Sequence, residues 1–382
     1  MKSDSALAAP GQVGNYNPLA FVVIAAALVG ALALQQAVGA WSPGAVRGAA
    51  VPGAASSSAA YGFLGSDVIR FDVQTGQVLA RHPYHLATQN PGLAVSHDGR
   101  SVFLLDAVWD GARAVDQLTE LAAATLAPQV AVATGDYARS MHAAVVVASD
   151  DRTVVIYHAS RSTPTYWLTL FDRRTGQTLP GQIPLPGCGA FQLVPMAQLV
   201  VLCDNTGDLR VINLAMRQVA SIIPLGSQVG RAVAAGPIQG TQAVAVITEN
   251  AQLVRVDLPT RAVSEVATFA PGQGRVVPFD GAAIAPSGQA VIALAATADE
   301  PAIDHAYSLL VVDTATGQVI RRQNQASQYG MWISLDGNRV FARQGQNGPL
   351  VAFDSRAQGA ASTGGATTMA QGGLSPYGLS FP

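Results

Sequence analysis

The sequence predicts an all-β fold, a seven-bladed β-propeller whose N- and C-terminal strands share one blade, preceded by a single N-terminal transmembrane or signal helix. Three observations predict it. A turn motif recurs seven times along the 382 residues, and apolar strand–turn–strand segments lie between its copies. The two ends of the repeated region supply complementary strands of one blade, and such closure removes exposed sheet edges.

The recurring motif is an Asp-x-x-Thr-Gly turn that follows an apolar strand. Clear copies are 71–77, 171–177 and 312–318, and degenerate copies are 121–125, 212–214, 256–260 and 353–355. Their anchor positions (72, 122, 172, 213, 257, 313 and 354) are 41 to 56 residues apart, a period typical of propeller blades. The Asp and Thr side chains can bond to the turn backbone, and Gly tolerates a left-handed conformation. We therefore interpret the motif as structural and not catalytic.

A second element recurs between these turns, an apolar strand, an Asp-Gly or Ser-Gly turn and another apolar strand, at 93–105, 283–294 and 332–341. Asp-Gly and Ser-Gly suit tight hairpins. Each blade is thus expected to contain strands a, b, c and d, with the Asp-x-x-Thr-Gly turn between c and d. Segments 61–64 and 68–71 fit strands b and c, and segment 375–382 fits strand a of the same blade. The propeller is expected to span 60–382.

This pattern resembles the seven-bladed propellers of the YVTN/WD40-like superfamily, which includes the amine dehydrogenase heavy chain and lactonase-type propellers. The resemblance covers 61–382 and concerns the repeat pattern, because the literal Tyr-Val-Thr-Asn segment is absent. It implies the fold. It implies no single function, because the superfamily contains binding, scaffolding and enzymatic members.

The first 59 residues differ in character: a polar segment (1–17), an apolar segment (18–41) and a flexible linker rich in Ala, Gly, Ser and Pro (42–59). Counted from Leu19 to Trp41, the apolar part has 23 residues, enough to span a bilayer core of about 30 Å. The alternative is a signal peptide cleaved after Ala40. We favour the uncleaved anchor, because the preceding region is long and nearly uncharged. Both interpretations place the propeller outside the cytoplasm, at a membrane (periplasmic or cell surface), or secreted if the segment is cleaved.

The composition excludes several functions. Only 12% of residues are charged, the net charge is −2 and the only lysine is Lys2. The folded part therefore has no phosphate-loop or Schiff-base lysine, and nucleic-acid binding is not expected. Haem-attachment, zinc-protease, nucleophile-elbow and Rossmann motifs are also absent, so the sequence requires no cofactor.

Without an assembled catalytic set, we expect a protein-interaction, scaffold or ligand-binding module. One alternative is a propeller enzyme or enzyme subunit, either a lactonase-like hydrolase or a subunit like the amine dehydrogenase heavy chain. Another is a structural subunit of a membrane complex.

The binding face is predicted from loop lengths. Extra residues fall in three b-to-c loops, 106–118, 158–166 and 295–307, which are expected to project from one face towards a protein partner or a small ligand. The d-to-a loops share that face and surround the channel mouth. A mixed polar ring with two arginines, able to hold a carboxylate or phosphate, is expected there. The alternative is an ordinary hydrated channel. The ring comprises Asn90, Arg139, His142, Arg231, Asp280, Tyr329 and Tyr377.

Two loops contain potential metal ligands, although a solvated loop is the preferred interpretation of both. They are the d-to-a loop with His82 and His85, and the acidic loop with Asp299, Glu300, Asp304 and His305.

The only cysteines, Cys188 and Cys203, fall on the predicted strands a and b of one blade. In an exported protein they can form a cross-strand disulfide, although the expected register misses direct pairing by two residues. The alternative is two buried thiols.

Overall fold

The structure is a computed structural model of the whole chain. It describes residues 59–64, 67–72, 77–84, 92–109, 111–136, 140–160, 163–189, 191–203, 206–226, 229–269, 276, 282–285, 287–295, 307–325, 328–333, 339–344, 350–355, 367–370 and 374–380. The predicted polar and apolar segments of the N-terminus, and the predicted linker up to residue 58, lie outside these residues. Ala59, predicted as the end of the linker, is instead buried as the first residue of a strand. Within the described ranges, no helix is both long and apolar enough to cross a membrane.

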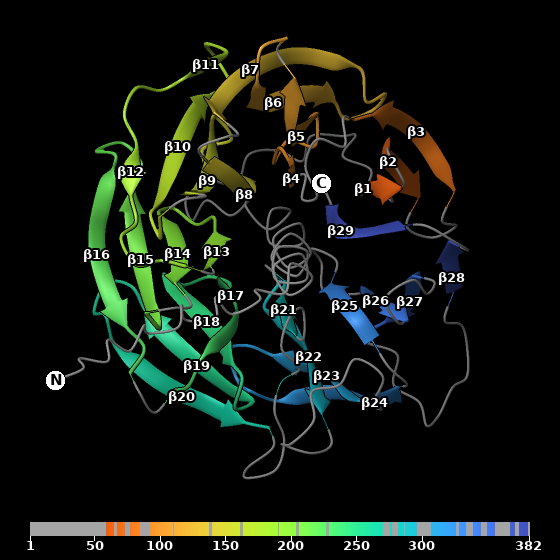
Figure 1. Ribbon diagram of the computed structural model, residues 1–382. Helices are drawn as coiled ribbons and strands as arrows, with labels where there is room; N and C mark the ends of the chain where they lie inside the picture. Colours follow the sequence, from red (N-terminus) through yellow and green to blue (C-terminus); the bar gives the residue numbers. More distant parts are fainter. Residues whose placement is uncertain are drawn as a thin grey trace, which may run out of the picture.

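The described strands form antiparallel sheets arranged radially around a central axis (Figure 1). The first three sheets contain the first twelve strands and the last one. They are β1 (Ala59–Leu64), β2 (Asp67–Asp72), β3 (Val78–Pro83) and β29 (Leu374–Ser380); β4 (Gly92–Val95), β5 (Ser101–Trp109), β6 (Ala114–Ala122) and β7 (Pro128–Asp136); and β8 (Ser140–Val147), β9 (Thr153–Ser160), β10 (Tyr166–Asp172), β11 (Gln177–Thr178) and β12 (Ile183–Pro184).

Four more sheets complete the set, so the sheets in the described part of the chain number seven. They are β13 (Phe191–Val194), β14 (Leu199–Cys203), β15 (Asp208–Asn213) and β16 (Gln218–Pro224); β17 (Ala232–Pro237), β18 (Ala243–Thr248), β19 (Gln252–Asp257) and β20 (Val263–Thr268); β21 (Ala282–Ile284), β22 (Gln289–Ala295), β23 (Tyr307–Asp313) and β24 (Val319–Gln325); and β25 (Gln328–Ile333), β26 (Arg339–Gln344), β27 (Leu350–Asp354) and β28 (Thr367–Ala370).

The predicted all-β propeller fold is confirmed. Strand a of each sheet lies nearest the axis and strand d lies outermost (Figure 1). The first sheet has the order β29-β1-β2-β3, so the last described strand supplies strand a beside β1, as the sequence predicted.

The Asp-x-x-Thr-Gly turns connect strands c and d and have the predicted structural role. In one copy, the Thr316 backbone N–H and hydroxyl both donate to Asp313 Oδ1, each at 2.8 Å. Gly176 and Gly317 have φ values of +66° and +72°, in the left-handed region that favours glycine. The turn chemistry therefore holds adjacent strands of one blade together.

The core lies between the sheets. Each buried apolar cluster of the described residues joins two neighbouring sheets, for example β8–β12 with β13–β16. Inner strands approach closely: a Cβ added to Gly236 in β17 would lie 2.6 Å from a side-chain carbon of Ile284 in β21. The outer strand β16 alternates between exposed and partly buried residues along most of its length. Blade-on-blade packing therefore holds the ring together.

The structure corrects two of the predicted b-to-c loops. Residues 106–109 and 114–118 are strand, because β5 and β6 stay paired as far as Trp109 and Ala114. In the next blade, β9 and β10 stay paired as far as Ala159 and Tyr166. Most of the extra residues thus lengthen hairpins instead of forming irregular loops. Most of the third segment, 295–307, lies outside the described residues.

Candidate binding face

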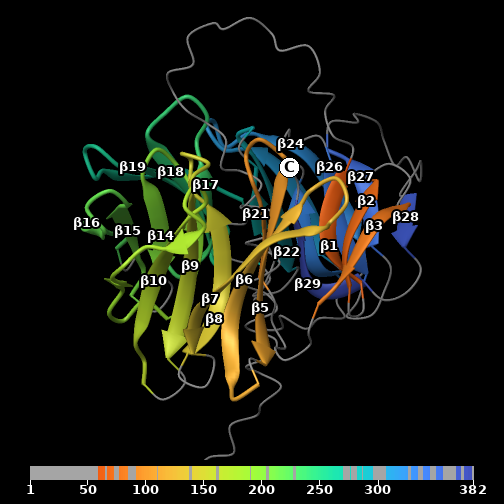
Figure 2. The same ribbon diagram turned by 90° about the horizontal axis from the view of Figure 1, so that it is seen from above.

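Two neighbouring blades carry long b-to-c hairpins at the same end of the propeller (Figure 2). Strands β5 and β6 have nine residues each, against four in β4 of the same blade. Strands β9 and β10 have eight and seven residues. Because both strands of each hairpin are paired along their length, the projecting ends are held by backbone hydrogen bonds.

Trp109 lies at the tip of the β5–β6 hairpin and is 69% exposed. The other large apolar side chains that are exposed in the described ranges lie elsewhere: Leu79, Ile222 and Val319 on outer strands, and Met216 in a c-to-d turn. The hairpin therefore presents a large indole to solvent from a regular, paired strand.

A buried polar pair lies behind these hairpins. His158 Nδ1 of β9 is 3.7 Å from Asp116 Oδ2 of β6, and the side chains are only 1% and 0% exposed. The His158 ring stacks on Trp167 of β10, with ring centroids 5.4 Å apart and planes 8° apart. The Asp106 carboxylate is also buried and accepts the Ala107 backbone N–H at 2.8 Å. Polar contacts therefore join the long hairpins of two blades.

This pair is not among the residues predicted from the sequence. The sequence predicts His158 as the first residue of one b-to-c loop and places Asp116 within another. The sequence contained a signal for their burial, because each residue lies in a segment rich in apolar residues. His142, a predicted channel-mouth residue, lies within β8, where its Cα is paired with that of His158. It was expected just before this strand.

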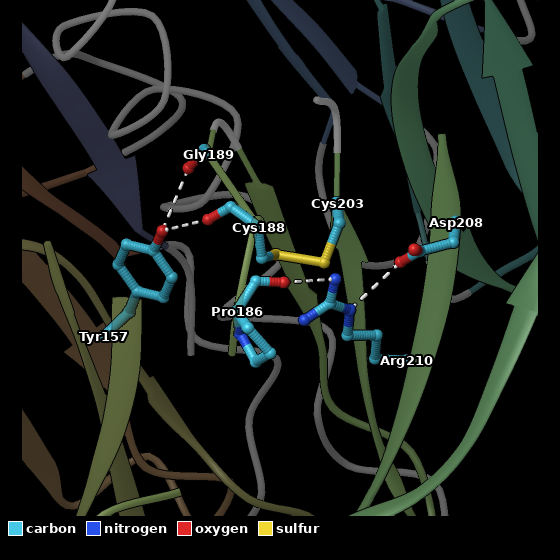
Figure 3. The surroundings of a disulfide bond; sticks show 7 residues. All are labelled: Tyr157, Pro186, Cys188, Gly189, Cys203, Asp208 and Arg210. Carbon is cyan, nitrogen blue, oxygen red and sulfur yellow. Dashed lines mark hydrogen bonds and ion pairs between the residues drawn. A yellow bond between two sulfur atoms is a disulfide. The ribbon is translucent and has the colours of Figure 1, made fainter. Parts of the chain in front are cut away.

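A disulfide fixes the d-to-a loop of the third blade on the same face (Figure 3). Cys188 and Cys203 are bonded, with Cα atoms 4.8 Å apart. The prediction that Cys188 lies on strand a is wrong. The residue paired with Cys203 across the sheet is Phe191, so Cys188 lies in the loop before β13.

Two buried side chains hold the same loop through its backbone (Figure 3). The Tyr157 hydroxyl donates to the carbonyl oxygens of Cys188 and Gly189, at 2.7 and 2.9 Å, and burial raises the pKa of this hydroxyl. Arg210 Nη2 donates to the Pro186 carbonyl at 2.8 Å, and its Nε contacts Asp208 Oδ1 at 3.1 Å. The loop is therefore bound covalently and by hydrogen bonds.

The predicted channel-mouth ring is described only in part. Arg231 is exposed and directly precedes the inner strand β17, as predicted. Tyr377 lies in β29, the predicted closing strand, whereas Tyr329 lies within β25 and not before it. Residues 90, 139 and 280 lie outside the described residues.

The predicted metal ligands are also described only in part. His82 lies near the end of strand β3, with Pro83, and not in a d-to-a loop as predicted. Residues 85, 299, 300, 304 and 305 lie outside the described residues. Among the side chains that the structure describes, no three His, Cys, Asp or Glu groups are placed to share a metal ion.

No family model matches this chain, and no curated protein matches it. Among solved structures, hydrazine synthase from Kuenenia stuttgartiensis is similar, with 13% sequence identity, a TM-score of 0.51, and coverage of 81% of this chain and 99% of that chain. A protein of unknown function from Bacteroides caccae has 11% identity and a TM-score of 0.46, over 70% of this chain and 93% of that one. The likeness to hydrazine synthase is one of fold.

Proposed function

We propose that the seven sheets are the blades of one closed ring of the YVTN/WD40-like kind, tethered outside the cytoplasm by residues 18–41. The ring is a protein-interaction module, and its partner binds the face formed by the β5–β6 and β9–β10 hairpins. The disulfide supports this location, because such bonds persist in oxidising compartments.

The observation that carries the proposal is Trp109, 69% exposed at the tip of a paired hairpin. Tryptophan is enriched among the residues that dominate binding energy at protein interfaces. A rigid hairpin loses little conformational entropy on binding. Burial of the Trp109 side chain against a partner therefore contributes to affinity with little opposing entropy cost. The buried Asp116–His158 contact supports the rigidity of the face, because it joins the two hairpins.

The test is co-purification of the full-length chain, tagged at its C-terminus and extracted gently from native membranes. The wild-type protein is expected to retain a stoichiometric partner, identified by mass spectrometry. Trp109→Ala is expected to reduce its recovery at least about tenfold, as for an interface hot spot.

The matched control is Met216→Ala, because Met216 is 65% exposed but lies in a c-to-d turn, away from the hairpin tip. This variant is expected to retain the partner. Equal recovery by both variants, or a wild-type chain that purifies alone, would contradict the proposal.

Binding of a small anion at the channel mouth is a second candidate. The exposed residue Arg231, which directly precedes the inner strand β17, favours it. The propeller enzyme would use the same region, and hydrazine synthase is an enzyme with a similar fold. If Ala substitution of Arg139, His142, Arg231 and Asp280 together changes neither ligand affinity nor any activity of the wild-type chain, this candidate fails.

A further inference from the structure

A pocket of about 260 Å³ lies between two neighbouring blades, β13–β16 and β17–β20. Turns form its rim: Pro195 and Met196 from an a-to-b turn, Gln239 from the next a-to-b turn, and Leu258 from a c-to-d turn. In antiparallel blades these turns lie at the opposite end from the b-to-c hairpins. The pocket is therefore separate from the binding face proposed above.

Hydrogen bonds to backbone carbonyl groups hold the rim in place. The Ile238 N–H donates to the Ala243 carbonyl at 2.9 Å, and the Thr241 hydroxyl donates to the Ile238 carbonyl at 2.9 Å. The Leu258 N–H donates to the Gln242 carbonyl at 3.0 Å, which ties two of the turns together. Prolines at 195, 237 and 259 restrict the backbone further. The pocket is thus formed before any ligand arrives.

The chemistry of the lining selects uncharged ligands. Every described residue of the lining is uncharged. Met196, Ile238 and Leu258 contribute apolar wall, while Gln198, Gln239 and Gln242 contribute amides that both donate and accept hydrogen bonds. A charged ligand would lose hydration here without gaining a counter-charge, whereas an amide would find matching partners.

We infer that this pocket binds an uncharged small molecule with an apolar body and at least one amide group. A cavity of about 150 Å³ accepts benzene, so the larger volume here accommodates a branched apolar group together with an amide. The inference is independent of the proposed function, because it concerns the other end of the blades.

The probe set is three molecules with the same leucine body: N-acetyl-leucinamide (neutral), N-acetyl-leucine (anionic) and leucinamide (cationic). Each is titrated into the full-length chain carrying ¹³C-methyl methionine, with signals assigned by Met→Leu variants. The neutral probe is expected to shift the Met196 methyl signal in a saturable way. The charged probes are expected to bind at least about tenfold more weakly. The exposed Met216 methyl, outside the pocket, is expected to stay unchanged.

Gln239→Glu places a negative charge on the exposed rim without disturbing the buried core. This variant is expected to narrow the preference, with leucinamide gaining about threefold in affinity relative to N-acetyl-leucinamide, because the new carboxylate is exposed to solvent. Gln218→Glu, at an exposed position outside the lining, is the matched control and is expected to keep the wild-type preference. The inference is overturned if the neutral probe leaves Met196 unshifted up to its solubility limit. It is equally overturned if all three probes shift Met196 alike, or if Gln239→Glu leaves the ratio of the leucinamide and N-acetyl-leucinamide affinities unchanged.

Discussion

Several c-to-d turns place a non-glycine residue where the regular turns have glycine. Arg261 has a φ of +61° and Leu126 a φ of +59°, close to the +66° of Gly176. A left-handed backbone costs a residue with a Cβ about 1 kcal/mol. The degenerate copies of the motif thus keep the turn geometry at a small expense in stability.

Arg261→Gly is expected to increase the free energy of unfolding by about 0.5 kcal/mol, because relief of the left-handed strain exceeds the entropy gained by the unfolded chain. Leu126→Gly is expected to reduce it by about 3 kcal/mol, because Leu126 is 1% exposed and its burial is lost. Urea unfolding of both variants checks this pair. If the free energy of unfolding changes in the same direction in both variants, the opposite effects expected from relief of backbone strain and from loss of burial are contradicted.

His97 connects the a-to-b turns of two blades. Its Nε2 is 2.7 Å from the Ala148 carbonyl oxygen, and its backbone N–H donates to Asp151 Oδ1 at 2.8 Å. Burial lowers the pKa of the imidazole, against the opposing effects of the hydrogen bond to Ala148 and of the nearby Asp151 and Asp150 carboxylates; Arg173 lowers it further. The folded protein therefore favours the neutral ring.

Stability is expected to decrease as the pH falls below about 6.5, because the unfolded chain then binds a proton that the folded His97 resists. The contribution is fully present above the unfolded pKa and is lost as the pH falls towards the lower folded pKa. Urea unfolding should be measured at several pH values between pH 8 and pH 5. The free energy of unfolding should change less with pH for His97→Asn than for wild type. Identical slopes would mean that His97 is not the titrating group.

At the scale of elements, the d-to-a loop before β13 depends on the disulfide. The bond links residues 15 apart in sequence, and closure of a loop of this size contributes about 3 kcal/mol. Reduction, or the double change Cys188→Ala and Cys203→Ala, should lower the free energy of unfolding by about that amount. Intact-mass measurement should show alkylation of two thiols only after a reductant is added. Two thiols that react in the native, unreduced protein would contradict the bond.

The long hairpins show why elements at the binding face were predicted only in part. Segments 106–118 and 158–166 contain polar residues among apolar ones, which indicates loops when each segment is considered alone. In the structure Asp106 is satisfied by its neighbour's N–H, and Asp116 meets His158 of the next blade. The contact between Asp116 and His158 depends on how two blades pack together, which cannot be predicted from a local sequence pattern.

For the whole molecule, the strand order followed from local chemistry. The turn motif with Asp313 and Thr316 is made within a few residues, so its spacing predicts the blades. The apolar segments at the two ends of the repeated region predict the pairing of β29 with β1. The Cys188–Cys203 bond was also anticipated, although with Cys188 on a strand. The pocket beside Met196 was not predicted from the sequence, because its walls come from turns of two blades.

The most direct test of the binding-face account is photo-crosslinking in living cells, with a photoreactive amino acid at position 109 of the full chain. Position 216, similarly exposed but in a c-to-d turn, is the control. One dominant crosslinked partner is expected from position 109, and none of that species from position 216. The same species from both positions, or no protein adduct from position 109, would contradict it.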